Sequence, residues 1–335
     1  MRQRLPCFVA ILVCLLTTDS ASVSAQAGRV GAFSLPDSPW DIQWQRFKRS
    51  VSASGLQLEY FIRGEVGSEE AMLSALKRNR LQVAGITVQG ITSVIPELAV
   101  AMSPFLFGSA EEVDFVYDNY LLDAVNESLA PHDLILLRWL ESGWFSIGSR
   151  NKIVLPTDLV DQRIGGSPNV GIQEFLLALG GDAVPIASID LVQSLDTGLI
   201  DGAIKPTALI YSNLRDQVNY VSLLRVAYDT GGLFANRSWF EALPSVYQSA
   251  LREGHGPSSA VRQEVRDLVQ FQVIDMKENG PQVIELSDEQ RRMWKRASEN
   301  VYRRIVDRSG PRAQLMYDTI TAAKAAFIRS QGDRP

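Results

Sequence analysis

Apolar and polar residues alternate near the start of the chain in a way that predicts a strand–helix–strand unit. In residues 56–60 every second side chain is apolar, which is typical of a strand with one buried face. Residues 64–67 form a turn signal, residues 68–76 place apolar side chains at helical spacing, and residues 81–86 form a second apolar strand. Because parallel strands require a crossover helix, this pattern predicts a β–α–β unit.

The same order recurs in the middle of the chain. A strand at residues 163–165 precedes a helical stretch at 172–179, which Gly180 and Gly181 end, and a strand at 183–186 follows. A short helix at 191–196 and a strand beginning at residues 199–203 come next.

The last third of the chain is predicted to be helical. Residues 279–281 (NGP) end one helix, Ser287 and Gln290 form a capping box that starts the next, and residues 309–311 (SGP) break the helix after it. No Pro- or Ser-rich linker separates two halves of the chain. The pattern as a whole therefore predicts two α/β lobes joined by crossing strands, with a cleft between them.

The first 27 residues read as a secretory signal peptide. A positively charged start precedes an apolar stretch at 7–16, which is too short to span a bilayer, and a small-residue cleavage site follows. An uncleaved membrane anchor is the alternative. Both cysteines, Cys7 and Cys14, lie inside this segment, so the mature chain is expected to be exported to the periplasm without any thiol.

The composition and the known short motifs give no sign of a catalytic or metal-binding centre. The 335 residues suggest two domains, and a net charge of −5 without a basic stripe argues against a nucleic-acid partner, so none is expected. Neither His132 nor His255 stands at a metal-ligand spacing, and the motifs GxGxxG, GxxxxGKS/T, GxSxG and HExxH are missing. We expect no catalytic centre, metal or cofactor, with a secreted hydrolase as the less favoured alternative. Such a protein fits a receptor whose lobes close on a solute.

An ordered set of short motifs spans nearly the whole chain after residue 27. They are GSEEAML at 67–73, LQVAG at 81–85, SPFLF at 103–107, WLESG at 139–143, LPTDL at 155–159, SLDTGLIDG at 194–202 and NRSW at 236–239. By this set the chain resembles the DctP family, the extracytoplasmic solute receptors of tripartite ATP-independent periplasmic (TRAP) transporters.

The resemblance implies a type II periplasmic-binding-protein fold, in which hinge strands and a long helix join two α/β lobes around a ligand cleft. It also implies that the lobes close on a small organic acid, which is delivered to membrane permease subunits. The expected division is a signal peptide at 1–27, a first lobe at 28–142 plus 231–270, and a second lobe at 143–230 plus 271–330.

The ligand-binding positions of the family carry over only in part. Where the family has an arginine that grips the ligand carboxylate, this chain has Gly165, and a second family arginine corresponds to Phe145. Where the family has an asparagine before a proline, this chain has Lys205. By resemblance the ligand site comprises Thr87, Trp144, Phe145, Gly165, Ser188 and Lys205.

Two interpretations of Lys205 follow. In the first, its ammonium pairs with a ligand carboxylate while Trp144 and Phe145 form an apolar wall, so the ligand is a small monocarboxylate with an apolar or aromatic body. In the second, Lys205 is a surface or hinge residue and the receptor binds a neutral ligand. The input domain of an exported sensor would share this fold and is a further alternative. Trp144 and Phe145 could instead pack in the core or at the hinge. Arg163, two residues before Gly165, could also reach toward the cleft.

Overall fold

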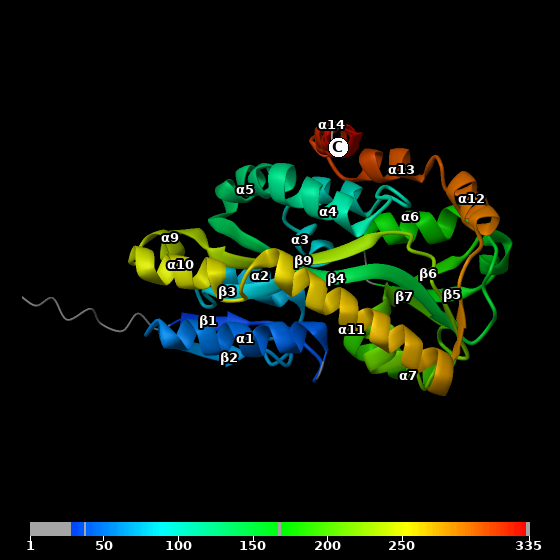
Figure 1. Ribbon diagram of the computed structural model, residues 1–335, viewed down its shortest axis with the longest axis horizontal. Helices are drawn as coiled ribbons and strands as arrows, with labels where there is room; N and C mark the ends of the chain where they lie inside the picture. Colours follow the sequence, from blue (N-terminus) through cyan, green and yellow to red (C-terminus); the bar gives the residue numbers. More distant parts are fainter. Residues whose placement is uncertain (1–27, 37, 167–168, 333–335) are drawn as a thin grey trace, which may run out of the picture.

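A mixed β-sheet runs through the centre of the protein and carries helices on both faces (Figure 1). The computed structural model describes residues 28–36, 38–166 and 169–332, so the predicted signal peptide lies outside the described residues. The strands are β1 (Gly28–Gly31), β2 (Leu58–Phe61), β3 (Val83–Thr87), β4 (Leu134–Ser149), β5 (Arg163–Gly166), β6 (Asp182–Pro185), β7 (Gly202–Pro206), β8 (Tyr220–Ser222), β9 (Tyr228–Asn236) and β10 (Gln282–Ile284).

The helices fill the connections between these strands and the end of the chain. The α-helices are α1 (Pro39–Ala53), α2 (Glu69–Lys77), α3 (Val88–Ile91), α4 (Ala110–Val116), α5 (Leu122–Leu129), α6 (Val170–Ala178), α7 (Leu191–Asp196), α8 (Thr207–Leu209), α9 (Arg237–Glu241), α10 (Ser245–Glu253), α11 (Ser258–Asn279), α12 (Asp288–Ala297), α13 (Val301–Arg308) and α14 (Ala313–Gly332). Shorter 3₁₀ or π segments are η1 (Pro96–Met102), η2 (Tyr117–Leu121), η3 (Ala130–His132), η4 (Pro156–Leu159), η5 (Ser188–Asp190) and η6 (Ile210–Leu214).

Strand β4 connects the two halves of the sheet. The strand order is β2-β1-β3-β9-β4-β7-β5-β6, with β8 beside the end of β4 and β10 beside β8. Residues 134–144 of β4 pair antiparallel with β9, and residues 145–149 pair antiparallel with β7. The register shifts next to Gly143, whose φ of +102° favours glycine. One continuous strand therefore passes from one half to the other, as the prediction of crossing strands requires.

Both predicted strand–helix–strand units are confirmed. Helix α2 connects the parallel strands β2 and β3, and α6 connects the parallel strands β5 and β6. Strands β5 and β6 are direct neighbours, whereas β1 lies between β2 and β3 and pairs with both. The pattern analysis missed β1 because its four residues, GRVG, include two glycines and are too short to show an alternation.

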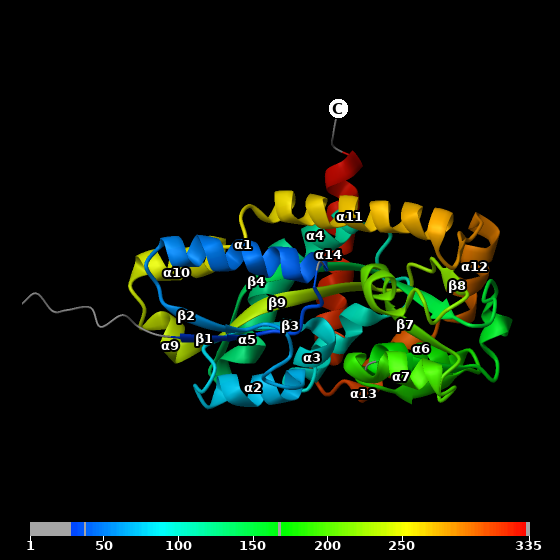
Figure 2. The ribbon, with the colours of Figure 1, turned by 90° about the horizontal axis from the view of Figure 1, so that it is seen from below.

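Helix α11 is the predicted long helix. It begins after Pro257 and ends at Gly280, and it contacts α1 and β4 in one half and η6 and β10 in the other. Figure 2 shows it running past both halves of the sheet. Val261, Val265 and Met276 on its inner face are buried. Among the described residues, no helix combines the length and the apolar character needed to cross a membrane.

The largest hydrophobic core lies beneath α4, α5, α6, α13 and α14. Two smaller cores lie between α1 and β1 and between α7 and β7. Helix α13 packs against α6, whereas α14 packs against η1 and α4 of the first half. The division into lobes stays a prediction, and α14, assigned to the second lobe, contacts elements assigned to the first.

Candidate functional site

Strand β7 buries a lysine in the middle of the molecule. Lys205 is 2% exposed and follows the buried residues Ala203 and Ile204. Its Nζ lies 3.1 Å from the hydroxyl of Ser188, to which it donates a hydrogen bond. Ser188 begins η5, directly after β6, so the ends of β6 and β7 bring these two predicted site residues together. Carboxyl ends of parallel strands are where α/β sheets bind ligands.

The end of β3 holds a carboxylate. Thr87 caps α3, where its hydroxyl accepts from the Gly90 backbone N–H at 3.0 Å. The Thr87 hydroxyl donates to Glu69 Oε2 at 2.8 Å, and its backbone N–H donates to Oε1 at 2.6 Å. Glu69 is the first residue of α2, where Ser68 caps the helix. Thr87 therefore positions the Glu69 carboxylate, and its own hydroxyl proton is already used.

A second carboxylate comes from β9. Asp229 is 2% exposed and lies opposite Gly143 of β4. The side-chain amide of Gln89 in α3 donates to Asp229 Oδ1 at 3.4 Å. The pKa of Asp229 is raised to about 7, mainly by burial and also by the charge of Glu69, against the opposing effects of Gln89, Lys205 and Ser142.

The two carboxylates and the lysine act on one another. Burial lowers the pKa of Lys205 to about 8, although the negative charges of Asp229 and Glu69 oppose this shift. Burial also raises the pKa of Glu69, against the hydrogen bonds from Thr87. We call Glu69, Thr87, Ser188, Lys205 and Asp229 the Lys205 cluster. Its charged members come from both sides of β4, so it lies where the two halves of the sheet meet.

The remaining predicted site residues lie in other surroundings. Phe145 is fully buried in the largest core. Trp144 is half-buried, and its ring meets Tyr228 edge-on with 4.7 Å between centroids. These two neighbours in β4 therefore have different contacts, and Trp144 is the more accessible of the two.

The glycine at the family arginine position faces a filled space. A Cβ on Gly165 would stand 2.7 Å from Ile200 Cδ1 and 3.2 Å from Leu191 Cδ2. Arg163, on the same strand, makes two hydrogen bonds to the carboxylate of Asp201, at 2.7 and 2.9 Å. Its guanidinium is thus occupied at the strand end, and it does not belong to the Lys205 cluster.

The sequence analysis missed Glu69, Asp229 and Gln89 as members of this region. Glu69 follows a helix cap, where an acidic residue is ordinarily explained by the helix dipole. Asp229 gave a usable signal, because it is the lone charged residue in a nine-residue strand that is buried throughout. Gln89 gave none.

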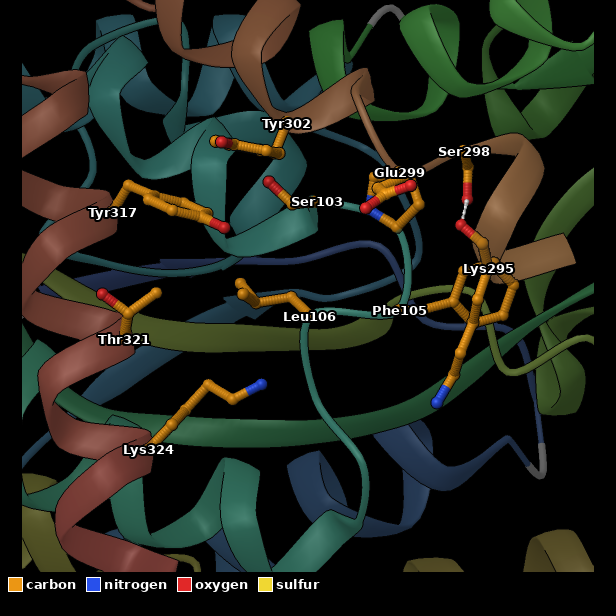
Figure 3. Close-up of a pocket in the computed structure, with 11 residues that line it drawn as sticks. Ser103, Phe105, Leu106, Lys295, Ser298, Glu299, Tyr302, Tyr317, Thr321 and Lys324 are labelled. Carbon is orange, nitrogen blue, oxygen red and sulfur yellow. Dashed lines mark hydrogen bonds between the residues drawn. The ribbon is translucent and has the colours of Figure 1, made fainter. Parts of the chain in front are cut away.

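A separate hollow of about 260 Å³ lies under the C-terminal helices (Figure 3). The rings of Tyr302 and Tyr317 stack at 4.8 Å on one side of it, and Lys324 lies 3.8 Å from Glu112. Its lining includes residues 103–106 of the SPFLF motif, which thus shapes this region of the first half. None of the predicted site residues lines this hollow.

The histidines and acidic residues do not assemble a metal site. Among the described residues, no group of three or more His, Cys, Asp or Glu side chains could hold a metal ion. His255 is fully buried and stacks on Phe47 with 4.6 Å between ring centroids. Burial lowers the pKa of His255 well below its usual value, so this ring packs as a neutral group.

The Lys205 cluster places hydrogen-bonding and charged groups from both halves of the sheet side by side. Such an arrangement is typical of a binding site for a small solute. Residues 32–309 match the family described as bacterial extracellular solute-binding protein, family 7 (DctP), and the chain belongs to that family. This confirms the resemblance found in the sequence. Members of this family are extracytoplasmic solute receptors and not enzymes.

Relatives and solved structures agree with this assignment. The ectoine/5-hydroxyectoine-binding periplasmic protein UehA of Ruegeria pomeroyi is 22% identical over 92% of this chain and 94% of its own. A TRAP solute-binding protein from Roseobacter denitrificans has a TM-score of 0.81 at 20% identity, covering 88% of this chain and 99% of that one. The periplasmic ectoine-binding protein of Halomonas elongata has a TM-score of 0.82 at 20% identity, covering 90% and 99%. These likenesses confirm the two-lobe fold.

Proposed function

We propose that this protein is the solute receptor of a TRAP transporter, that it binds a small organic acid at Lys205, and that it delivers the acid to membrane permease subunits. The observation that carries the proposal is the buried ammonium of Lys205, 3.1 Å from the Ser188 hydroxyl. Taking an ammonium out of water is costly unless anions and hydrogen bonds compensate it. A ligand carboxylate adds an anion, and the Ser188 O–H can donate a second hydrogen bond to it.

The relatives support a small solute as the ligand. The Roseobacter denitrificans structure is described with bound β-D-glucuronate, and the Ruegeria pomeroyi and Halomonas elongata proteins are described as ectoine-binding. The choice of an acid for this chain rests on Lys205, because identities of 20 to 22% carry the fold and not the ligand.

The shape of the ligand follows from the residues around the charge. One ammonium is a point charge, so it favours a single carboxylate contact over the bidentate grip of a guanidinium. We assign Trp144 as the apolar wall for the body of the ligand, because it is half-buried, whereas Phe145 is enclosed in the core. The ligand is then a small monocarboxylate with an apolar or aromatic part.

The test is thermal unfolding of the purified protein with a panel of small organic acids and neutral sugars. A ligand that binds only the folded state stabilises it by about 2.7 kcal/mol at a hundredfold excess over Kd. We expect a rise in Tm with at least one acid, and loss of that rise in Lys205→Ala and in Lys205→Met, which keeps most of the volume.

The matched control is Lys295→Ala, which removes an exposed lysine at the separate hollow and should leave the response unchanged. Circular dichroism establishes that each variant is folded. A Tm rise that survives in both Lys205 variants, or a response to neutral sugars alone, would contradict the proposal.

A further inference from the structure

The first turn of α1 lies at the same edge of the sheet as the candidate site. Helix α1 is the next element after β1, and β1 is parallel to β3. A helix that follows a parallel strand begins near the carboxyl end of that strand. Trp40, at the start of α1, and Thr87, at the end of β3, therefore lie at one edge. Trp40 is half-buried, so part of its indole is open to solvent.

The indole of Trp40 lies across three neighbouring strands. A Cβ on Gly231 of β9 would stand 2.3 Å from Trp40 Cζ2, and a Cβ on Gly85 of β3 would stand 3.4 Å from Trp40 Cζ3. The Nε1–H of Trp40 donates to the backbone oxygen of Glu141 in β4 at 3.0 Å. Strand β9 lies between β3 and β4 in the sheet. The ring therefore covers β9 at Gly231 and is held there by a hydrogen bond.

The lack of a side chain at Gly231 gives the ring its place. A Cβ at this position would meet the indole at 2.3 and 2.6 Å, and its next neighbour would be the backbone oxygen of Ile86 at 3.0 Å. Gly231 is not among the glycines with a positive φ, so its backbone conformation is open to other residues. The close approach of Trp40 therefore accounts for a glycine in this strand.

The covered position is next to members of the Lys205 cluster. Gly231 is the register partner of Thr87, and residues directly opposite each other in antiparallel strands share a face. Asp229 is two residues before Gly231 in β9, so its side chain points to the same face. The Trp40 indole, Thr87 and Asp229 are therefore neighbours on one face of the β3–β9 pair.

Resting on the proposed function, we propose that Trp40 contacts the solute and selects its body: the open part of the indole is an apolar wall from the first half for the acid whose carboxylate Lys205 receives. Trp144 of β4 is the other wall. Aromatic side chains offer large, rigid apolar faces. Two indole walls therefore favour a monocarboxylate with a flat, aromatic body over one with a short alkyl chain.

A purely structural role of Trp40 makes a different prediction. If the indole only packs on Gly231 and the neighbouring core, its removal lowers the stability of the folded protein and weakens the binding of every acid by the same factor. If the indole contacts the solute, its removal weakens binding in proportion to the apolar area of the acid. The ratio of two affinities therefore separates the two roles.

The experiment is isothermal titration calorimetry with phenylacetate and butanoate, which share a carboxylate and differ in their apolar body. We expect the wild-type protein to prefer phenylacetate. Trp40→Ala should lower the affinity for phenylacetate about tenfold or more and that for butanoate by less than about threefold. Trp40→Phe keeps an aromatic ring and should retain most of the preference.

Gly231→Ala tests the same contact without removing the indole. The added methyl group displaces the Trp40 ring, so this variant should also lower the preference for phenylacetate. In the Trp40→Ala background it should cause no further loss of preference, because the ring is no longer there to be displaced. Additive losses would refute the link between Gly231 and Trp40.

The matched control is Tyr247→Ala. Tyr247 of α10 is also half-buried and packs against the same core as Trp40. Its removal should lower the free energy of unfolding in urea but leave the preference between the two acids unchanged. Circular dichroism establishes that each variant is folded, and Gly231→Ala replaces Trp40→Ala if the latter is not.

The possible results separate this proposal from the proposed function. Equal losses for both acids in Trp40→Ala, or an unchanged preference, overturn the solute contact of Trp40 and leave the organic-acid receptor standing. If neither acid binds the wild-type protein, the selection of an aromatic body is overturned. The proposed function fails as well only if no acid of the wider panel gives a response that depends on Lys205.

Discussion

Two groups of charges meet the sheet close together, one at Glu141 of β4 and one at Asp229 of β9, and they are built in opposite ways. The first is the Lys205 cluster. The second, which we call the α11 clamp, comprises Asp114, Asp118, Glu141, Arg262 and Arg266. In the clamp, the long helix reaches the sheet and α4 through guanidinium groups. In the cluster, a single ammonium faces two carboxylates.

In the α11 clamp, both guanidinium groups are paired with carboxylates. Arg262 holds both oxygens of Asp118 at 2.6 and 2.7 Å, and Arg266 reaches Asp114 at 2.7 Å and Glu141 at 3.1 Å. Planar guanidinium groups match carboxylates in this way, and the resulting hydrogen bonds are short and charge-assisted. The clamp is therefore complete without any ligand.

The pKa values of the basic residues shift in opposite directions in the two groups. Burial acts against the charge of Arg262 and Arg266, but their carboxylate partners more than offset it and raise both pKa values. Burial lowers the pKa of Lys205 to about 8 despite its two acidic neighbours. Fully paired guanidinium groups favour a structural role for the clamp, and the lowered pKa of Lys205 agrees with the ligand-binding role proposed for the cluster.

Removing a clamp arginine should produce the largest effect. Arg266→Met leaves Glu141, whose side chain is 1% exposed, buried beside Tyr228 without its guanidinium partner. We expect a loss of about 3–5 kcal/mol in the free energy of unfolding, measured by urea denaturation. The control is Arg46→Met. Arg46 of α1 forms a more exposed ion pair with Glu264 of α11, the helix that also carries Arg266, and its loss should cost about 1 kcal/mol or less. Equal losses in the two variants would refute the structural role of the clamp.

The pH dependence of stability should show the second effect, at the Lys205 cluster. The ordinary pKa of an aspartate is 3.8, and that of Asp229 in the folded protein is about 7. Between these values the folded state holds a proton that the unfolded state releases, so Asp229 makes stability fall as pH rises, by up to about 1.4 kcal/mol per pH unit.

Lys205 acts in the opposite direction at higher pH. Its pKa is about 8 when folded against an ordinary 10.5, so its contribution rises with pH between these values. Together the two groups place a minimum of stability between about pH 7 and pH 8. The measurement is the difference in unfolding free energy between the wild-type protein and Asp229→Asn at several pH values, in which other titrating groups cancel. A difference that stays constant from pH 4 to pH 7 would contradict the assignment.

Much of the fold could be predicted from local patterns. The units at 56–86 and 163–186, the capping box of Ser287 with Gln290 and the end of α11 at Gly280 all follow from residues close in the sequence. The position of β1 between β2 and β3 did not, because strand order depends on contacts between distant segments.

The candidate site residues were predicted from the family resemblance, which gave their positions in the chain but not their contacts. Lys205 and Ser188 are in contact, but the two carboxylates beside them come from residues 69 and 229, which are far apart in the chain. Their effect on the lysine depends on burial and on spatial proximity, neither of which a local pattern contains. The role of the predicted ligand residues therefore stays a prediction until binding is measured.

The smallest effect should come from Tyr228, which precedes Asp229 in β9 and contacts the α11 clamp. The hydroxyl of Tyr228 donates to the Glu141 carboxylate of the clamp, and its ring meets Trp144. Tyr228→Phe removes the hydroxyl and keeps the ring, so we expect a loss of about 1–2 kcal/mol in the free energy of unfolding, because Arg266 still pairs with Glu141.

The same variant should leave ligand affinity unchanged, because it keeps the ring that meets Trp144 and removes only the hydroxyl that donates to Glu141. Asp229→Asn should do the reverse and change the affinity for the acid, because it removes a negative charge that acts on Lys205. A change of ligand affinity in Tyr228→Phe would mean that the clamp and the Lys205 cluster are one coupled unit and not two. Two adjacent residues of β9 thus test whether α11 is fixed to the sheet and the solute is bound by separate sets of charges.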